Sequence, residues 1–158
     1  MSVAFTKESD AEAVAADLPD RPISPHPNLV TAEGLAALDR SLSEAKAAYE
    51  LAQAGGAISS DRTAMARATR DLRYYSARRA SAQLIEAGDC DTVKFGCRVT
   101  FDRADGRRQT FRITGEDEAD PANGSISYLS PVARALLGKA VGDEAMVGGG
   151  AVELVAIE

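Results

Sequence analysis

Three side chains in this sequence could bind a transition metal, namely Cys90, Cys97 and the single histidine, His26. A tetrahedral zinc site takes about four sulfur or nitrogen ligands, and these three residues are scattered along the chain without a CxxC pair. We therefore expect no metal and no cofactor. We interpret the two cysteines as small thiols in or near a core, with no disulfide between them.

A set of arginines could bind an anionic partner. Residues 58–87 carry six arginines and three acidic residues, whereas the whole chain has a formal net charge of −6. At about 100° per residue along a helix, five of these arginines lie on one arc, away from the apolar positions. The five are Arg62, Arg67, Arg70, Arg73 and Arg78. The arc is either a solvated face or a surface for an anion such as RNA. The negative net charge argues against binding to duplex DNA, sequence-specific binding included.

Two helical segments have to position these arginines. Apolar residues recur at steps of three and four over residues 35–52 and again over residues 65–75, which is the spacing of a coiled-coil seam. A Gly-Gly pair separates the two segments. The pattern predicts an antiparallel two-helix hairpin within residues 29–90. It follows a flexible, proline-rich N-terminal extension, residues 1–28.

Residues 91–158 have a different periodicity. Apolar and polar residues alternate over residues 97–102 and again after an Asp-Gly turn, which predicts antiparallel strands. Ser130 is a good helix N-cap with Pro131 at the first helical position, and Gly138 can end that helix in a left-handed conformation. We predict an α+β chain in which the helical hairpin precedes a small antiparallel β domain with one short helix.

The composition, 45% hydrophobic and 27% charged, is typical of a soluble protein. No apolar run approaches the roughly 20 residues of a membrane span. Charged residues occupy the place where a secretory signal would have its apolar core. We therefore expect no membrane association and a cytoplasmic location.

The order of a helical hairpin and then a small β-rich domain resembles the Gre-type (GreA/GreB) transcript cleavage factors of bacteria. The resemblance covers about Leu29 to Glu158 and is most specific in the second half of the chain. The segments that match the family in register are Thr31-Ala32-Glu33-Gly34, Phe95-Gly96, Gly115-Glu116-Asp117-Glu118-Ala119-Asp120-Pro121, Asn123-Gly124, Ser130-Pro131, Arg134-Ala135-Leu136-Leu137-Gly138-Lys139 and Val141-Gly142-Asp143-Glu144.

The resemblance implies a fold and a partner. It implies an FKBP-like domain over residues 91–158 that docks on bacterial RNA polymerase beside the secondary channel, while the hairpin reaches down the channel toward the nascent RNA 3′ end. The chain would then be a transcription elongation factor and not an enzyme. Basic hairpin residues that attract RNA in the family favour the anion-binding interpretation of the arginine arc. The docking residues that the resemblance suggests are Asp120, Pro121, Ser130, Pro131, Arg134 and Lys139, with Leu136 and Leu137 in the core.

The hairpin turn departs from the family, whose turn carries two carboxylates that are implied to help the polymerase hold a second Mg²⁺ and activate water. The same register here contains Ala57, Ser59, Ser60 and Asp61. Asp61 is the one carboxylate left, and it is displaced by about 100° around a helix. We therefore predict no catalytic residues, and a factor that modulates or inhibits transcript cleavage instead of stimulating it.

Other functions remain open. The chain could stimulate cleavage of backtracked RNA through Asp61, or act as an adaptor that binds a partner other than polymerase through the arginine arc. More remotely, it could be an FKBP-type prolyl isomerase, which needs an aromatic pocket. The aromatic residues available for such a pocket are Phe95, Phe101, Phe111 and Tyr128, and three of them occupy strand positions that indicate a core.

Overall fold

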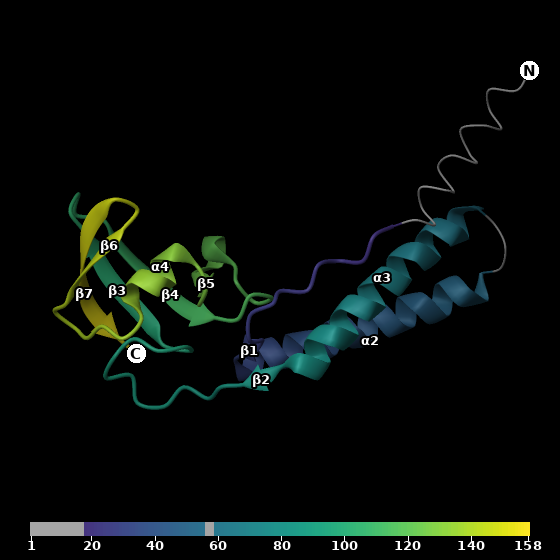
Figure 1. The fold of residues 1–158 in the computed structure, drawn as a ribbon, viewed down its shortest axis with the longest axis horizontal. Helices are drawn as coiled ribbons and strands as arrows, with labels where there is room; N and C mark the ends of the chain where they lie inside the picture. The colour runs from purple at the N-terminus through teal and green to yellow at the C-terminus, as the bar shows by residue number, and fades with distance from the viewer. Residues whose placement is uncertain (1–17, 56–58) are drawn as a thin grey trace, which may run out of the picture. The chain divides into compact units, whose positions relative to one another are not determined.

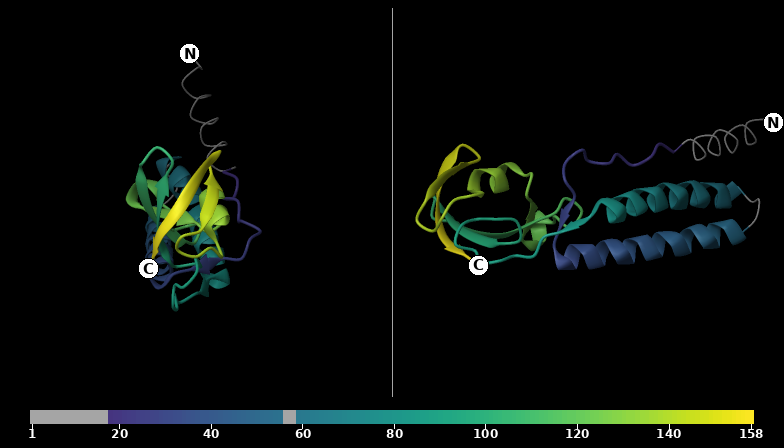
Figure 2. Two further views of the ribbon diagram at one scale, coloured as in Figure 1. Left: turned by 90° about the vertical axis from the view of Figure 1, so that its left-hand side faces the viewer. Right: turned by 60° about the horizontal axis from the view of Figure 1, so that its bottom comes forward.

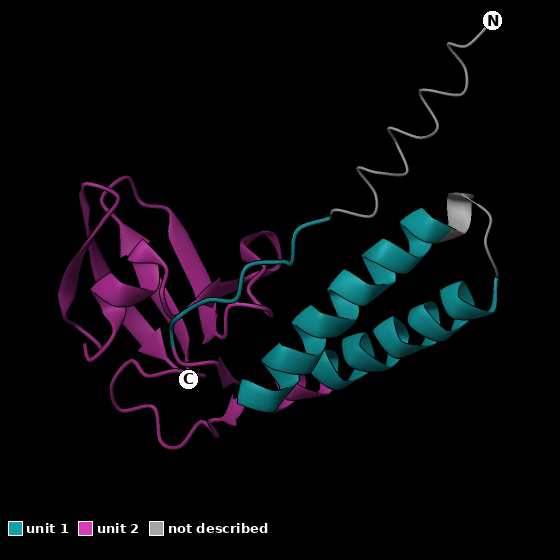
Figure 3. Ribbon diagram, turned by 45° about the vertical axis from the view of Figure 1, so that its right-hand side comes forward, with its two compact units in different colours: residues 1–26, 37–81 teal, residues 27–36, 82–158 magenta. Residues whose placement is uncertain are grey.

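The structure is a computed structural model that describes residues 18–55 and 59–158, and for residues 59–61 it describes the backbone alone (Figure 1). The chain divides into two compact units (Figure 3). One contains residues 37–81 together with the described residues up to His26, and the other contains residues 27–36 and 82–158. We describe each unit by itself.

The first unit is built on two helices, α2 (Ala32–Ala54) and α3 (Ser59–Ser81), each of 23 residues. They run side by side in Figure 1 and in the right-hand view of Figure 2. The apolar seam predicted from the sequence is confirmed, because its members from residue 35 to 52 and from 65 to 75 are buried or half-buried. Arg79 of α3 pairs with Asp39 of α2 and ties the helices together. Among the described residues, no helix is long and apolar enough to span a bilayer.

The described part of the N-terminal extension contacts α3. The Arg21 guanidinium lies 3.8 Å from the ring centroid of Tyr74 and donates to Asp71 Oδ1 over 3.3 Å. Asp20 Oδ1 accepts a 3.2 Å hydrogen bond from Arg73 Nη1. Residues 18–28 contain no helix or strand, as the prolines predict, but cation–π and ionic contacts hold this stretch along the helix.

The second unit contains a curled five-stranded sheet with strand order β5-β4-β3-β7-β6 (Figure 2). The strands are β3 (Arg98–Arg103), β4 (Arg108–Thr114), β5 (Ser125–Ser127), β6 (Glu144–Val147) and β7 (Gly150–Ile157). The alternation over residues 97–102 is confirmed, because Val99 and Phe101 are fully buried. The short helix α4 (Pro131–Leu136) contacts β5 and β6 and covers the core.

The predicted antiparallel β domain contains one pairing that is parallel. β5 runs parallel to β4, with Arg112 opposite Ser125. For two neighbouring strands to be parallel, the chain must return to the end of the sheet at which the first strand began before the second strand starts. The loop after β4 and the short 3-10 helix η1 (Pro121–Asn123) make this return. β5 has only three residues, so its sequence carries no usable alternation.

A two-stranded parallel sheet, absent from the sequence prediction, joins the chain before α2 to the chain after α3. Its strands are β1 (Leu29–Val30) and β2 (Gln83–Leu84). The Gln83 N–H donates to the Asn28 carbonyl over 2.8 Å, and the Ile85 N–H donates to the Val30 carbonyl over 3.0 Å. These bonds close the second unit around residues 27–36.

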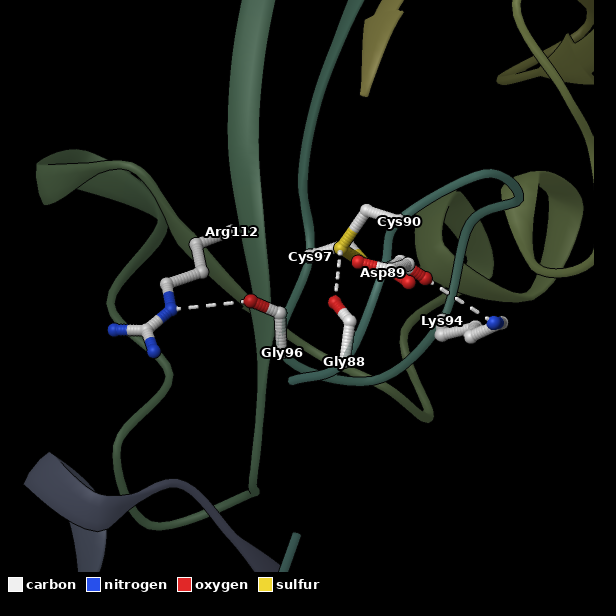
Figure 4. The surroundings of a disulfide bond; sticks show 7 residues. All are labelled: Gly88, Asp89, Cys90, Lys94, Gly96, Cys97 and Arg112. Atoms are coloured by element: carbon white, nitrogen blue, oxygen red, sulfur yellow. Dashed lines mark hydrogen bonds between the residues drawn. A yellow bond between two sulfur atoms is a disulfide. The ribbon is translucent and has the colours of Figure 1, made fainter. Parts of the chain in front are cut away.

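The expectation of two free thiols is wrong, because Cys90 and Cys97 form a disulfide (Figure 4). Their Cα atoms lie 6.1 Å apart although the residues are separated by seven positions. The chain turns back between them through Gly96, whose φ of 89° falls in the left-handed region that favours glycine. Sequence spacing alone does not reveal this turn.

Candidate functional site

The helix that the sequence singled out has the predicted caps. Ser130 Oγ accepts a 3.2 Å hydrogen bond from the Ala133 N–H, and Pro131 occupies the first turn. Leu136 is fully buried, as predicted. The prediction that Leu137 is a core residue is wrong: it ends the helix with 36% of its surface exposed. Gly138 then takes a φ of 84°.

An exposed surface follows the end of α4, and we call Arg134, Leu137, Lys139 and Val141 the α4 surface. Arg134 is exposed and Lys139 is half-buried, so both can present a positive charge. Leu137 and Val141 expose apolar side chains, the latter by 57%. Buried Ala133 and Leu136 anchor this segment on the sheet. A fixed surface with apolar and cationic groups can bind a protein with apolar and acidic side chains.

Asp120 and Pro121, the other predicted docking residues, lie in the loop between β4 and β5. Asp120 Oδ2 accepts a 2.6 Å hydrogen bond from Asn123 Nδ2, and its backbone N–H donates to Ser125. Pro121 begins η1. Both residues are exposed, but the contacts of Asp120 maintain the shape of its own loop.

Glu118 of the same loop completes the cap of α2, a role that the sequence reasoning missed. Its carboxylate accepts hydrogen bonds from the Thr31 N–H over 3.0 Å and from Thr31 Oγ1 over 2.5 Å. Thr31 Oγ1 in turn accepts the Gly34 N–H over 3.1 Å. In a capping box, a Glu at the third helical position bonds the N-cap N–H. Here that position is Gly34, and Glu118 supplies the carboxylate from 87 residues away.

The space for this carboxylate exists because residue 34 is a glycine. A Cβ added at Gly34 would collide with the Glu118 carboxylate. Gly115 has a similar role, since a Cβ there would collide with the Leu29 carbonyl. The only sequence signal for the contact is an N-cap threonine without Glu or Gln three residues later. The arrangement fixes the first turn of α2 within the second unit.

The arginine arc of α3 is only partly available to a partner. Arg62, Arg67 and Arg73 are exposed and Arg70 is half-buried, whereas Arg78 retains 2% of its surface. The prediction that Arg78 belongs to an exposed face is therefore wrong, because burial in the folded chain overrides its helical-wheel position. Arg73 also pairs with Asp20 over 3.2 Å. The accessible cations lie mainly in the first half of α3.

The hairpin turn falls largely outside the described residues. Ala57 lies in the undescribed stretch, and Ser59, Ser60 and Asp61 begin α3 with side chains that are not described. Of these four residues, Asp61 alone has a carboxylate.

The aromatic residues considered for an isomerase pocket belong to the core of the second unit. Phe101 is fully buried and packs 6.2 Å from Phe111, and Phe95 meets Tyr128 edge to face at 5.8 Å. Phe95, Phe111 and Tyr128 are partly buried against the same cluster. Their packing gives them a structural role, which argues against the prolyl isomerase interpretation.

Comparison with known proteins finds proteins that are similar to parts of this chain. Residues 88–158 match the family model described as transcription elongation factor, GreA/GreB, C-terminal. The chain is 43% identical over 97 residues to transcription elongation factor GreA of Desulfovibrio desulfuricans, covering 60% of this chain and 59% of that protein. It is 55% identical over 56 residues to GreA of Hyphomonas neptunium, covering 35% and 36%. The chain thus spans less than two thirds of the length of these relatives.

A solved structure of GreA factor homolog 1 (Gfh1) from Thermus thermophilus aligns with 84% of this chain and 99% of its own. The identity is 22% and the TM-score is 0.40. A likeness at this level does not bear on how the elements of the present chain are arranged. The similarity to the GreA/GreB family therefore rests on the sequence matches, above all the one over residues 88–158.

Proposed function

We propose that the chain, whose residues 88–158 match the GreA/GreB C-terminal family model, is a Gre-type factor that binds bacterial RNA polymerase through this domain and regulates transcript elongation. The family match over residues 88–158 carries the proposal. The α4 surface supports it, because exposed Leu137 and Val141 beside Arg134 offer a firm contact for an apolar and acidic partner.

We further propose that the hairpin enters the secondary channel without supplying a metal-binding carboxylate pair. At 1.5 Å per residue, helices of 23 residues are about 35 Å long. A second Mg²⁺ needs several oxygen ligands, preferably charged, and Asp61 is the one carboxylate that residues 57–61 offer. Occupying the channel in this way would modulate or inhibit cleavage. The alternative, stimulation through Asp61, makes the opposite prediction for the same assay.

We also propose that the hairpin contacts the nascent RNA 3′ end. Arg62 and Arg67 are exposed cations near the start of α3, close in sequence to the hairpin turn. Arg78 is buried, and both Arg73 and Arg78 lie farther along α3 from the turn. RNA contact should therefore depend on the first two arginines and weaken with salt.

A transcript cleavage assay in purified, backtracked polymerase complexes tests the regulatory part. With the full chain at stoichiometric amounts, we expect no shortened RNA, and slower cleavage when a GreA relative is also present. The Asp61→Ala variant should behave like the wild-type chain. Efficient shortening that is lost in Asp61→Ala would overturn the proposal and establish the alternative. Shortening that persists in Asp61→Ala would overturn both.

A further inference from the structure

The Cys90–Cys97 disulfide lies where an irregular segment meets the sheet of the second unit (Figure 4). Cys97 directly precedes β3 and retains 1% of its surface. Cys90 is half-buried and lies in a stretch without helix or strand that is mostly exposed. The two sulfurs therefore differ in access: a dissolved thiol can approach Cys90, while the protein interior shields Cys97.

We propose that Cys90 is a thiol–disulfide exchange site, at which a dithiol reductant opens the Cys90–Cys97 bond and a disulfide oxidant closes it again. In the opening step, a thiolate of the reductant attacks Cys90 Sγ, forms a mixed disulfide and releases Cys97 as a thiolate. The second thiolate of the reductant then attacks the sulfur that the reductant contributed to the mixed disulfide, and Cys90 leaves as a thiolate. Two electrons and two protons pass to the protein, and the reductant becomes a disulfide.

The contacts around the bond allow both states. Cys90 Sγ lies 3.6 Å from the Gly88 carbonyl oxygen, which can accept a hydrogen bond from the reduced thiol. Lys94 Nζ donates to the Asp89 carbonyl over 3.2 Å. Both contacts lie within the segment itself. When the bond opens, the Cys90 thiol can therefore keep the Gly88 carbonyl as its hydrogen-bond acceptor.

The bond determines how much of the segment is tethered. Val93 is 1% exposed, its N–H donates to the Lys139 carbonyl, and its carbonyl accepts the Gly138 N–H, both over 2.8 Å. Within the part of the chain that the structure describes, no backbone hydrogen bond holds residues 86–92. In the oxidised state the disulfide fixes Cys90, so the stretch without a backbone–backbone hydrogen bond or a disulfide is 86–89. In the reduced state it extends over 86–92.

This tether ends at the α4 surface. Val93 pairs with Gly138 and Lys139, the residues that follow α4. Farther along the chain, Gly96 is anchored to β4, because its N–H donates to the Ile113 carbonyl over 2.8 Å. When residues 90–92 become more mobile, the two backbone hydrogen bonds that Val93 makes with Gly138 and Lys139 are therefore the first to weaken. The redox state of the cysteines thereby controls how firmly the chain is held against the end of α4.

The test uses the full chain equilibrated in buffers with different ratios of reduced to oxidised dithiothreitol. Alkylation in denaturant after an acid quench makes both cysteines accessible, and mass spectrometry then counts the free thiols. Hydrogen exchange on the native chain reports on the Val93 and Gly138 amides. We expect zero alkyl groups per chain in the oxidised state and two in the reduced state, with full return on reoxidation. Reduction should lower the protection of the two amides roughly tenfold. The Cys90→Ser variant should show the lower protection in every buffer.

Two outcomes would overturn the proposal. One is that both cysteines remain alkylatable under oxidising conditions, or remain blocked under excess reductant. The other is that the amides of Val93 and Gly138 are equally protected in both states and in Cys90→Ser. Neither measurement includes RNA polymerase, so a failure here leaves the proposed transcriptional function in place. A failure of polymerase binding likewise leaves the exchange site in place.

Discussion

The Glu118 carboxylate bonds Thr31 at the start of α2. We therefore predict that Gly34→Ala lowers the free energy of unfolding of the wild-type chain but raises that of the Glu118→Ala variant. Gly34 occupies the third position of the helix, and Ala is favoured over Gly in helices by about 1 kcal/mol. In the wild-type chain, however, the new Cβ would displace Glu118 from Thr31. In a Glu118→Ala background the collision partner is gone, and the same substitution should stabilise the chain.

The magnitude follows from the contacts that are lost. Glu118 accepts two short hydrogen bonds from Thr31, and bonds to a charged group contribute about 1.5–3 kcal/mol each. Thr31 is 2% exposed, so its N–H would be left without water. Taking a loss of about 3 kcal/mol against the helical gain, Gly34→Ala should destabilise the wild-type chain by about 2 kcal/mol. It should stabilise Glu118→Ala by about 0.5–1 kcal/mol.

Urea unfolding followed by circular dichroism, applied to the two single variants and the double variant, measures this coupling. Gly88→Ala is the matched control, because a Cβ at Gly88 meets no atom within 4 Å; its free energy of unfolding should stay within about 1 kcal/mol of wild type. The reasoning is refuted if Gly34→Ala has the same effect in both backgrounds within about 0.5 kcal/mol.

Three smaller effects should accompany it. Ser130→Ala removes the N-cap acceptor of α4 and should lower the free energy of unfolding by about 1 kcal/mol in urea; an unchanged midpoint would contradict the cap. Arg21→Ala should shift the Tyr74 ring resonances and cost about 0.5–1 kcal/mol, whereas unchanged resonances would mean that the segment is free. Backbone hydrogen bonding, with help from Arg112, lowers the pKa of Glu33 below 4.5. Its stabilising effect is complete above 4.5 and is lost as the pH falls through the lowered pKa. Arg112→Ala should raise this pKa in an NMR titration, and no change would exclude the ion pair.

The sequence predicted the elements whose signals are local. The seam over residues 35–52 specified one arm of the hairpin, and Ser130 followed by Pro131 specified the start of α4, because helical spacing and caps are read within a few residues. The predicted alternation around Phe101 likewise matched a strand with a buried face.

The features that the sequence left open depend on contacts between distant residues. Glu118 meets Thr31 across 87 positions, and nothing near either residue indicates the other. Arg78 is buried by the folded chain although its place on the helical wheel suggests exposure. The disulfide required the turn at Gly96, and the parallel β5 was too short to display a period. In each case tertiary structure overrode or completed the local pattern.

Binding of the fluorescently labelled full chain to purified bacterial RNA polymerase tests the central claim most directly. We expect saturable binding that an unlabelled GreA relative displaces. The double substitution Arg134→Ala with Lys139→Ala should weaken the binding at least tenfold. Removing two interface charges should cost about 1.4 kcal/mol or more, which corresponds to a tenfold loss of affinity. Arg107→Ala, in the β3–β4 turn outside the α4 surface, should leave the affinity unchanged. Absence of saturable binding, or equal affinities for all three chains, would contradict the account.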